Sequence, residues 1–159
     1  MNADLPDVAT ILGAVLQRVP PVHRPLLIAL AERGAAERYR VWAKDATDET
    51  RSACLAACAE REEEIARRVE SLYPDAAYVQ RDLLAQHPDL GEITRAVFAG
   101  RPLAAQLAIQ ARGERAGAAV WRSFARHASD EAARAELLHC AELEEESAVY
   151  LEAVLQGQP

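Results

Sequence analysis

Aromatic residues are scarce in this 159-residue chain: they make up 5% of it, and glycine and proline occur only 7 and 8 times. Strands favour aromatic and β-branched side chains, so their scarcity speaks against a β-rich fold. Alanine makes up about a fifth of the residues, and it loses no side-chain entropy when a helix forms. The composition therefore predicts an all-α protein, and the length suits a single domain over residues 1–159 with one hydrophobic core.

Positive charge is also in deficit. The 18 Lys and Arg residues against 25 Asp and Glu residues give a formal net charge of −7. A nucleic-acid binder needs a basic face that displaces counterions, and an anionic membrane surface attracts the same positive charge. No apolar run reaches the length of a membrane span. We therefore expect neither a nucleic acid nor a membrane as a partner.

Cysteine occurs only three times, at positions 54, 58 and 140, and an odd number does not make a disulfide framework. The first ten residues show no basic stretch ahead of an apolar one, which is the pattern of a secretory signal. Both observations favour the cytoplasm as the location. We interpret Cys58 and Cys140 as small buried hydrophobic residues rather than as a redox pair.

Apolar residues recur at helical spacing through most of the chain. The pattern predicts an amphipathic helix over 7–19, ended by two prolines. Its apolar face could cover the rest of the fold or form a dimer contact, and we favour the dimer contact. Long helices are predicted over residues 24–45, 47–73, 102–127 and 129–155, with two short helical segments between 75 and 100.

The chain contains an internal repeat, because residue n resembles residue n + 82 over much of the long helices. Cys58 and Cys140 are one equivalent pair. Two copies of one helical hairpin, residues 24–73 and 102–155, are thus joined by a crossover over residues 75–100. Two such hairpins can bury their apolar faces against each other as an antiparallel four-helix bundle.

Each long helix carries one glutamate in the middle of its apolar stripe: Glu32, Glu62, Glu114 and Glu144. Glu32 lies about 15 residues before the turn of its hairpin and Glu62 about 15 after it. At roughly 1.5 Å per residue, the two glutamates reach the same level. The second hairpin repeats this arrangement, so a pseudo-two-fold axis between the hairpins would bring all four carboxylates into one layer.

Burial of ionised carboxylates without partners costs several kcal/mol each. No Arg or Lys lies within one turn of these glutamates on the inward faces. Two remedies stay open. Bound cations are one, since hard oxygen ligands suit Fe, Mn, Mg or Ca. Shared protons are the other, with the pKa values of the carboxyl groups raised by burial and by like charge.

Other inward residues could support such a layer. Gln110 lies one turn before Glu114 and could donate a hydrogen bond to its carboxylate. Tyr39 and Trp121 lie two turns beyond Glu32 and Glu114. We interpret these two aromatic residues as filler of an alanine-rich core rather than as part of a site.

These residues resemble the ferritin-like superfamily, in particular rubrerythrins and the small encapsulated ferritins. The resemblance covers residues 24–155. On the first and third long helices it consists of a glutamate followed by small and aromatic residues at helical spacing. On the second and fourth it consists of a Glu-x-x-x-Ala segment. The residues concerned are Leu30, Ala31, Glu32, Ala36, Tyr39 and Ala43; Ala108, Glu114, Ala118, Trp121 and Ala125; 62–66; and 144–148. The resemblance implies a ferritin-like antiparallel four-helix bundle with a long crossover, here with an extra N-terminal helix.

The resemblance also implies a di-iron or di-manganese centre, which in that family carries out ferroxidase, peroxidase or oxygen-activating chemistry. The four glutamates match the carboxylate ligands of the family. Its two Glu-x-x-His histidines do not carry over, because Ile65 and Ser147 stand at those positions. A centre of four carboxylates is harder and more anionic, so it would hold metal more weakly or prefer Mn, Mg or Ca.

Two functions follow from these observations. The first is a divergent ferritin-like or rubrerythrin-like protein that binds iron or manganese at the four glutamates, as an oxidoreductase or a metal-handling protein. The second is a metal-free bundle that acts as an interaction or assembly module. A small-molecule pocket between the helices is a third possibility. We expect a homodimer or a higher homo-oligomer, because close-packed bundles of this kind commonly pair.

Overall fold

The computed structural model describes residues 5–157, and this part of the chain is all helical, with no strand. The predicted all-α class is therefore confirmed. In chain order the elements are α1 (Val8–Gln17), the 3₁₀ turn η1 (Pro21–His23), α2 (Arg24–Asp45), α3 (Glu49–Ser71), α4 (Ala76–Gln86), α5 (Leu90–Phe98), α6 (Leu103–Arg126) and α7 (Glu131–Leu155).

The helices begin and end within two residues of the predicted positions, because their end signals are local. Asp7, Asp48 and Asp130 cap α1, α3 and α7, and each side chain accepts a hydrogen bond from the backbone N–H three residues later. The segment over residues 75–100 contains two short helices, α4 and α5, as predicted.

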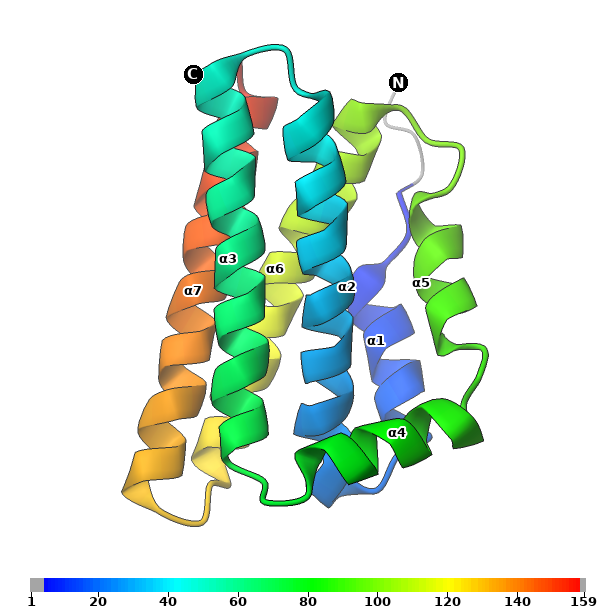
Figure 1. The fold of residues 1–159 in the computed structure, drawn as a ribbon, viewed down its shortest axis with the longest axis vertical. Helices are drawn as coiled ribbons and strands as arrows, with labels where there is room; N and C mark the ends of the chain where they lie inside the picture. The colour runs from blue at the N-terminus through cyan, green and yellow to red at the C-terminus, as the bar shows by residue number, and fades with distance from the viewer. Residues whose placement is uncertain (1–4, 158–159) are drawn as a thin grey trace.

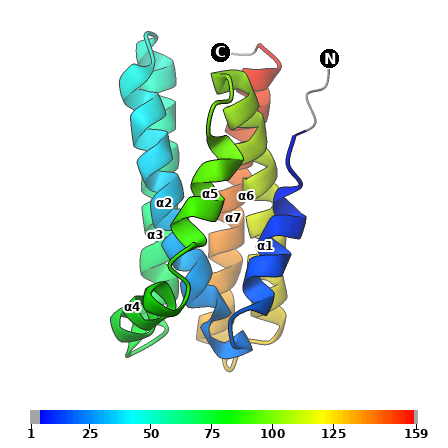
Figure 2. The ribbon, with the colours of Figure 1, turned by 90° about the vertical axis from the view of Figure 1, so that its right-hand side faces the viewer.

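The four long helices lie side by side along the longest axis of the molecule (Figure 1). Helix α2 packs against α3, α6 packs against α7, and α3 packs against α7. The turn of the α2–α3 hairpin and the turn of the α6–α7 hairpin lie at opposite ends (Figure 1). Helices α4 and α5 connect the hairpins, with α4 across one end and α5 running back along the side (Figure 2).

Helix α1 lies against the side of the bundle and packs on α6. Its Leu12 and Leu16 contact the core cluster around Ile28 and Trp121. The apolar face of α1 therefore covers part of the bundle, which is the first of the two roles open from the sequence. A homodimer or higher homo-oligomer stays a prediction, and it would need a surface other than these two leucines.

Two clusters of buried apolar residues fill the bundle at different heights. One contains Ile65, Trp121 and Cys140, and the other contains Tyr39 and Cys58. On each long helix, the glutamate singled out from the sequence lies between residues of the first cluster and residues of the second. The fold thus holds a polar layer between two apolar ones.

No helix within residues 5–157 is long and apolar enough to cross a membrane. The expectation of a cytoplasmic location stays a prediction.

Candidate metal centre

The four glutamates predicted as site residues all lie in the interior. The exposed fraction is 8% for Glu32, 0% for Glu62, 1% for Glu114 and 2% for Glu144. One comes from each long helix, because each occupies the middle of an inward stripe. The sequence pattern therefore identified the inward position of each glutamate correctly.

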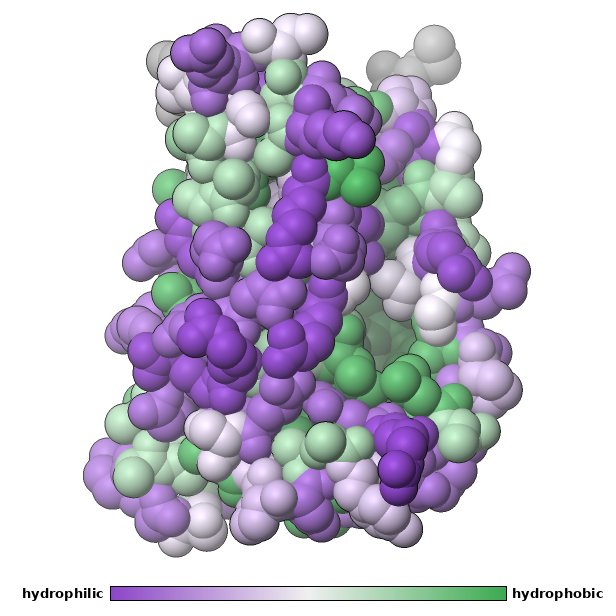
Figure 3. All heavy atoms as spheres, in the orientation of Figure 1, coloured by the Kyte–Doolittle hydropathy of each residue, from purple (hydrophilic) through white to green (hydrophobic). Residues whose placement is uncertain are grey.

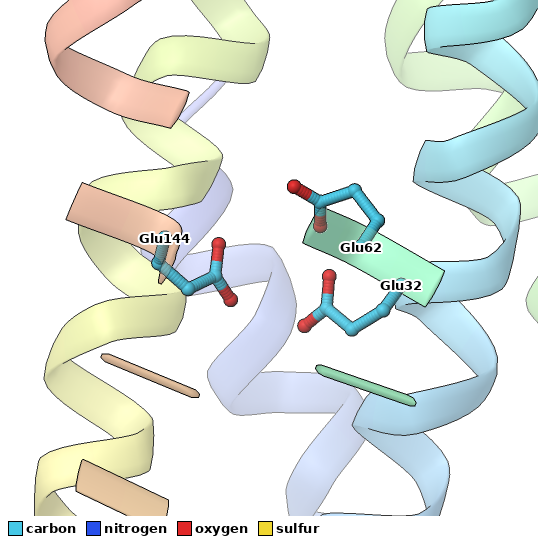
Figure 4. A group of neighbouring side chains, drawn as sticks. All are labelled: Glu32, Glu62 and Glu144. Atoms are coloured by element: carbon cyan, nitrogen blue, oxygen red, sulfur yellow. The ribbon is translucent and has the colours of Figure 1, made fainter. Parts of the chain in front are cut away.

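Three of these carboxylates meet. One oxygen atom from each of Glu32, Glu62 and Glu144 lies within 4.8 Å of the other two. Figure 4 shows the three side chains pointing toward one another from α2, α3 and α7. Glu114 does not belong to this close group. The expected layer of four is thus a group of three carboxylates with the fourth beside it.

Glu114 is held by two hydrogen-bond donors. The Tyr39 hydroxyl donates to Glu114 Oε1 at 2.6 Å, and Gln110 Nε2 donates to the same oxygen at 2.7 Å. Arg38 in turn donates to Gln110 Oε1 at 3.1 Å. The expected contact of Gln110 with a carboxylate is confirmed, and these donors hold Glu114 beside the close group.

Glu144 and Glu62 are held less completely. Trp121 Nε1 donates to Glu144 Oε1 at 2.9 Å, while Ser147 Oγ reaches Glu62 Oε1 only at 3.5 Å. The interpretation of Tyr39 and Trp121 as core filler is therefore incomplete, since both are fully buried and both donate to site carboxylates. A signal was present in the sequence, because a buried tyrosine hydroxyl or indole N–H usually needs a hydrogen-bond partner.

Two carboxylate oxygens are left without a partner. Glu62 Oε2 and Glu114 Oε2 are buried and make no hydrogen bond within the described residues. The ion pairs of residues 5–157 join arginines or a histidine to other acids, and none involves the four glutamates. The site therefore has an excess of acceptors that protein donors do not satisfy.

Burial shifts the titration of these groups. It raises the pKa of Glu32 to about 7, against the opposing effect of hydrogen bonds with Glu62 and Glu144. Burial also raises the pKa of Glu62 and of Glu144 well above the usual range, and the negative charges of Glu32 and Glu114 add to both shifts. Carboxylates in this layer consequently need a bound cation or a proton at neutral pH.

Among residues 5–157, the close group of candidate ligands contains no nitrogen or sulfur donor. Ile65 and Ser147, at the positions of the family's histidines, are both fully buried, and the close group of candidate ligands within residues 5–157 holds only glutamates. Burial raises the pKa of the Cys58 and Cys140 thiols to about 11 and about 12. Both thiols are thus protonated at neutral pH and act as packing residues, as expected. The donor set is all oxygen, which suits hard cations.

Gly117 on α6 is a further site residue that the sequence pattern did not reveal. A Cβ atom at this position would overlap with Glu144 Oε1 and lie 2.8 Å from its Cδ. Glycine is therefore the residue that lets the Glu144 carboxylate lie against the α6 backbone. Helical periodicity carries no signal for such a contact, because it depends on the distance between two helices.

Comparison of this chain with protein-family models, with curated proteins and with solved structures finds no match. Its resemblance to the ferritin-like superfamily thus stays a prediction that depends on the residues described above.

Proposed function

We propose that this chain binds divalent metal ions, iron or manganese, at Glu32, Glu62, Glu114 and Glu144, as a divergent ferritin-like protein. The observation that carries the proposal is the buried layer of four carboxylates, which form no ion pair with an Arg or Lys of residues 5–157 and two of whose oxygens accept no hydrogen bond from that part of the chain. An unsatisfied buried acceptor costs about 1–3 kcal/mol, and more when it is charged. A bound cation removes this penalty.

The geometry assigns different parts to the four ligands. Glu32, Glu62 and Glu144 would hold one ion, because their oxygen atoms already lie within 4.8 Å of one another. Glu114 would offer its free Oε2 to a second ion, while Tyr39 and Gln110 keep its Oε1 in place. Such hydrogen bonds to the ligands fix their orientation and tune their affinity for metal.

The arrangement of the helices supports the family assignment. The hairpins have their turns at opposite ends, so the connection between α3 and α6 runs the length of the bundle (Figures 1 and 2). One long crossover of this kind is typical of ferritin-like bundles. When bound, a pair of iron or manganese ions supplies the redox chemistry with oxygen or peroxide that ferritin-like proteins carry out. Without histidine ligands, the site also suits a metal-handling role.

The test is elemental analysis of protein purified separately with Mn²⁺, Fe²⁺, Mg²⁺ or Ca²⁺ and then desalted. We expect one or two ions of manganese or iron per chain and a higher melting temperature than that of chelator-treated protein, because an ion that binds only the folded state stabilises it. Glu62→Gln keeps the shape of the side chain but removes its charge, so the metal content should fall to less than half.

The matched control is Glu60→Gln on the same helix, since Glu60 is exposed and takes part in none of the ion pairs within residues 5–157. It should bind as much metal as the natural chain. Well under one ion per chain with every metal supplied would contradict the proposal.

The second candidate function is a metal-free bundle that acts as an interaction or assembly module. The raised pKa values of Glu62 and Glu144 favour it, because protonated carboxyl groups can donate hydrogen bonds to one another. The same variant separates the two candidates. In a metal-free protein, Glu62→Gln should raise the melting temperature at pH 8, whereas loss of a metal ligand should lower it in the metal-loaded protein.

A further inference from the structure

A cavity of about 800 Å³ opens between α1, α2, α5 and α6. Figure 3 shows its mouth as a hollow with hydrophobic walls, on the side of the molecule where α5 faces α2. Pockets that bind small molecules have volumes of roughly 300–1,000 Å³ and mostly apolar walls with a few polar groups. The size and the lining of this cavity therefore match a binding site for a small molecule.

The walls are largely aliphatic. Ile11 and Val15 of α1, Ile93 and Val97 of α5 and Ile109 of α6 line the cavity. Neither α1 nor α5 has a fully buried residue, although both helices are amphipathic. Their apolar faces thus border the cavity and stay partly open to water. An apolar occupant would remove this surface from water, at about 25 cal/mol per Å².

Polar groups gather at the end of the cavity next to the metal centre, where Glu32, Gln110 and Glu114 form part of the wall. Arg38 also lines this part of the cavity, and its guanidinium carbon lies 4.2 Å from the centre of the Phe98 ring. Arg38 donates to the neutral Gln110.

Arg38 lies in this wall without a direct ion pair within residues 5–157. Burial lowers the pKa of Arg38, and the negative charges of Glu114 and Glu32 oppose that shift without forming a direct ion pair with it. Glu114 accepts two hydrogen bonds through its Oε1. An anionic head group would therefore complete the contacts of Arg38, and guanidinium pairs with carboxylate through two parallel hydrogen bonds.

We propose that the cavity binds an apolar monocarboxylate of the fatty-acid class, with its hydrocarbon chain against α1 and α5 and its carboxylate paired with Arg38. The aliphatic walls suit an unbranched chain, since each CH₂ group that they bury adds about 0.8 kcal/mol. This inference goes beyond metal binding and rests on the cavity and on Arg38, so it stands or falls separately from the metal centre.

The test is a calorimetric titration of both chelator-treated and manganese-treated protein with dodecanoate, dodecanol and dodecylamine. We expect saturable binding of one dodecanoate per chain, at least about tenfold tighter than dodecanol, since one hydrogen bond to a charged group is worth that factor. Arg38→Gln should lower the affinity for dodecanoate to that for dodecanol and leave the affinity for dodecanol unchanged.

A pair of tryptophan variants tests the location. Ala31 lies on the cavity wall and is exposed, so a tryptophan side chain there should obstruct the cavity. Ala31→Trp should therefore lower the affinities for dodecanoate and for dodecanol at least about tenfold. Ala57 is exposed on α3 and does not line the cavity, so Ala57→Trp should change neither affinity. Circular dichroism of each variant verifies that the helical content is retained.

Several results would overturn the inference: no saturable dodecanoate binding in either form of the protein, dodecylamine binding as tightly as dodecanoate, or unchanged affinity in Ala31→Trp. Loss of a dimer in Ala31→Trp without dodecanoate binding would assign the cavity to a second copy of the chain instead. Dodecanoate binding by a protein that takes up no metal would contradict the proposed function and leave this inference intact.

Discussion

Single residues decide how each buried carboxylate is accommodated. Glu144 has an indole donor in Trp121, and its carboxylate occupies the space that a side chain at position 117 would need. Glu62 is fully buried beside two other carboxylates, yet the one hydroxyl that donates to it within the described residues is that of Ser147 at 3.5 Å, and its Oε2 has no partner there. Glu62 is therefore the ligand with the most to gain from a cation or a proton.

Replacement of Gly117 by alanine tests the close contact with Glu144. The added Cβ would overlap with the carboxylate, so the Glu144 side chain must move away from its place in the site. We expect Gly117→Ala to lower the free energy of unfolding by about 1–3 kcal/mol, as overpacking does, and to reduce metal content. Urea unfolding and elemental analysis measure the two effects.

The control for this variant is Gly13→Ala in the middle of α1, where a Cβ would meet no atom within 4 Å. Glycine inside a helix is less favourable than alanine by about 0.5–1 kcal/mol. Gly13→Ala should therefore stabilise the protein, and a gain of stability in Gly117→Ala as well would contradict the assigned contact.

At the scale of the helices, the 82-residue repeat extends to the contacts that hold each hairpin together. Asp48 caps α3, and Asp130, its equivalent, caps α7. The equivalent ion pairs are Arg33 with Glu63 and Glu70 in the first hairpin, and Arg115 with Glu145 and Glu152 in the second. These arginines are partly exposed, so each pair adds only about 0–1 kcal/mol. The repeated contacts therefore set the register of the two helices in each hairpin and add little to the stability of the fold.

The cap of α7 provides a test at this scale. The Asp130 carboxylate accepts a hydrogen bond from the backbone N–H of Ala133 at 2.8 Å. Asp130→Ala leaves that N–H without its partner, and we expect a loss of about 1 kcal/mol in the free energy of unfolding. Asp130→Asn keeps an acceptor oxygen and should stay within about 0.5 kcal/mol of the natural chain. Equal losses in both variants, measured by urea unfolding, would exclude the cap as the cause.

At the scale of the whole molecule, the acidic layer exists only because the two hairpins dock. Docking puts an apolar cluster on each side of the layer, one around Trp121 and one around Tyr39. Water is thereby removed from carboxylates that would be solvated in a separate hairpin. This loss of water is the first cause of the raised pKa values of Glu32, Glu62 and Glu144.

The stability of the chelator-treated protein should therefore fall as the pH rises. A group whose pKa is higher in the folded than in the unfolded state stabilises the fold below its unfolded pKa, and this contribution is lost as the pH rises through the folded pKa. Folding raises the pKa of Glu32 from its usual value of 4.5 to about 7. One pKa unit corresponds to about 1.4 kcal/mol, so Glu32 alone lowers the free energy of unfolding by on the order of 3 kcal/mol between pH 5 and pH 8.

Thermal melts at several pH values, with and without manganese, measure this dependence. Bound metal takes the place of the protons, so the melting temperature of the metal-loaded protein should fall less between pH 5 and pH 8. A flat profile for the chelator-treated protein over that range would contradict the burial of ionisable carboxylates in the core.

Local signals in the chain were enough to predict the helices and the inward glutamates. Aspartate caps and prolines act on the nearest turn of a helix, so the ends of α2 and α7 could be predicted to the residue or nearly so. The stripes that contain Glu32 and Glu114 are likewise a property of a single helix, since spacings of three and four residues return to one face. Membership of the ferritin-like superfamily, inferred from the same stripes, stays a prediction.

The arrangement of the site, in contrast, depends on how far apart the helices lie and how each is rotated. Tyr39 and Trp121 are equivalent in the repeat, yet Tyr39 donates to a carboxylate of the other hairpin and Trp121 to one of its own. Gly117 matters only because α7 approaches α6 closely, and Arg38 borders a cavity lined mainly by α1, α2, α5 and α6. Periodicity defines which face of a helix turns inward, whereas the packing of every core side chain sets the distances between helices, and those distances decided which groups meet.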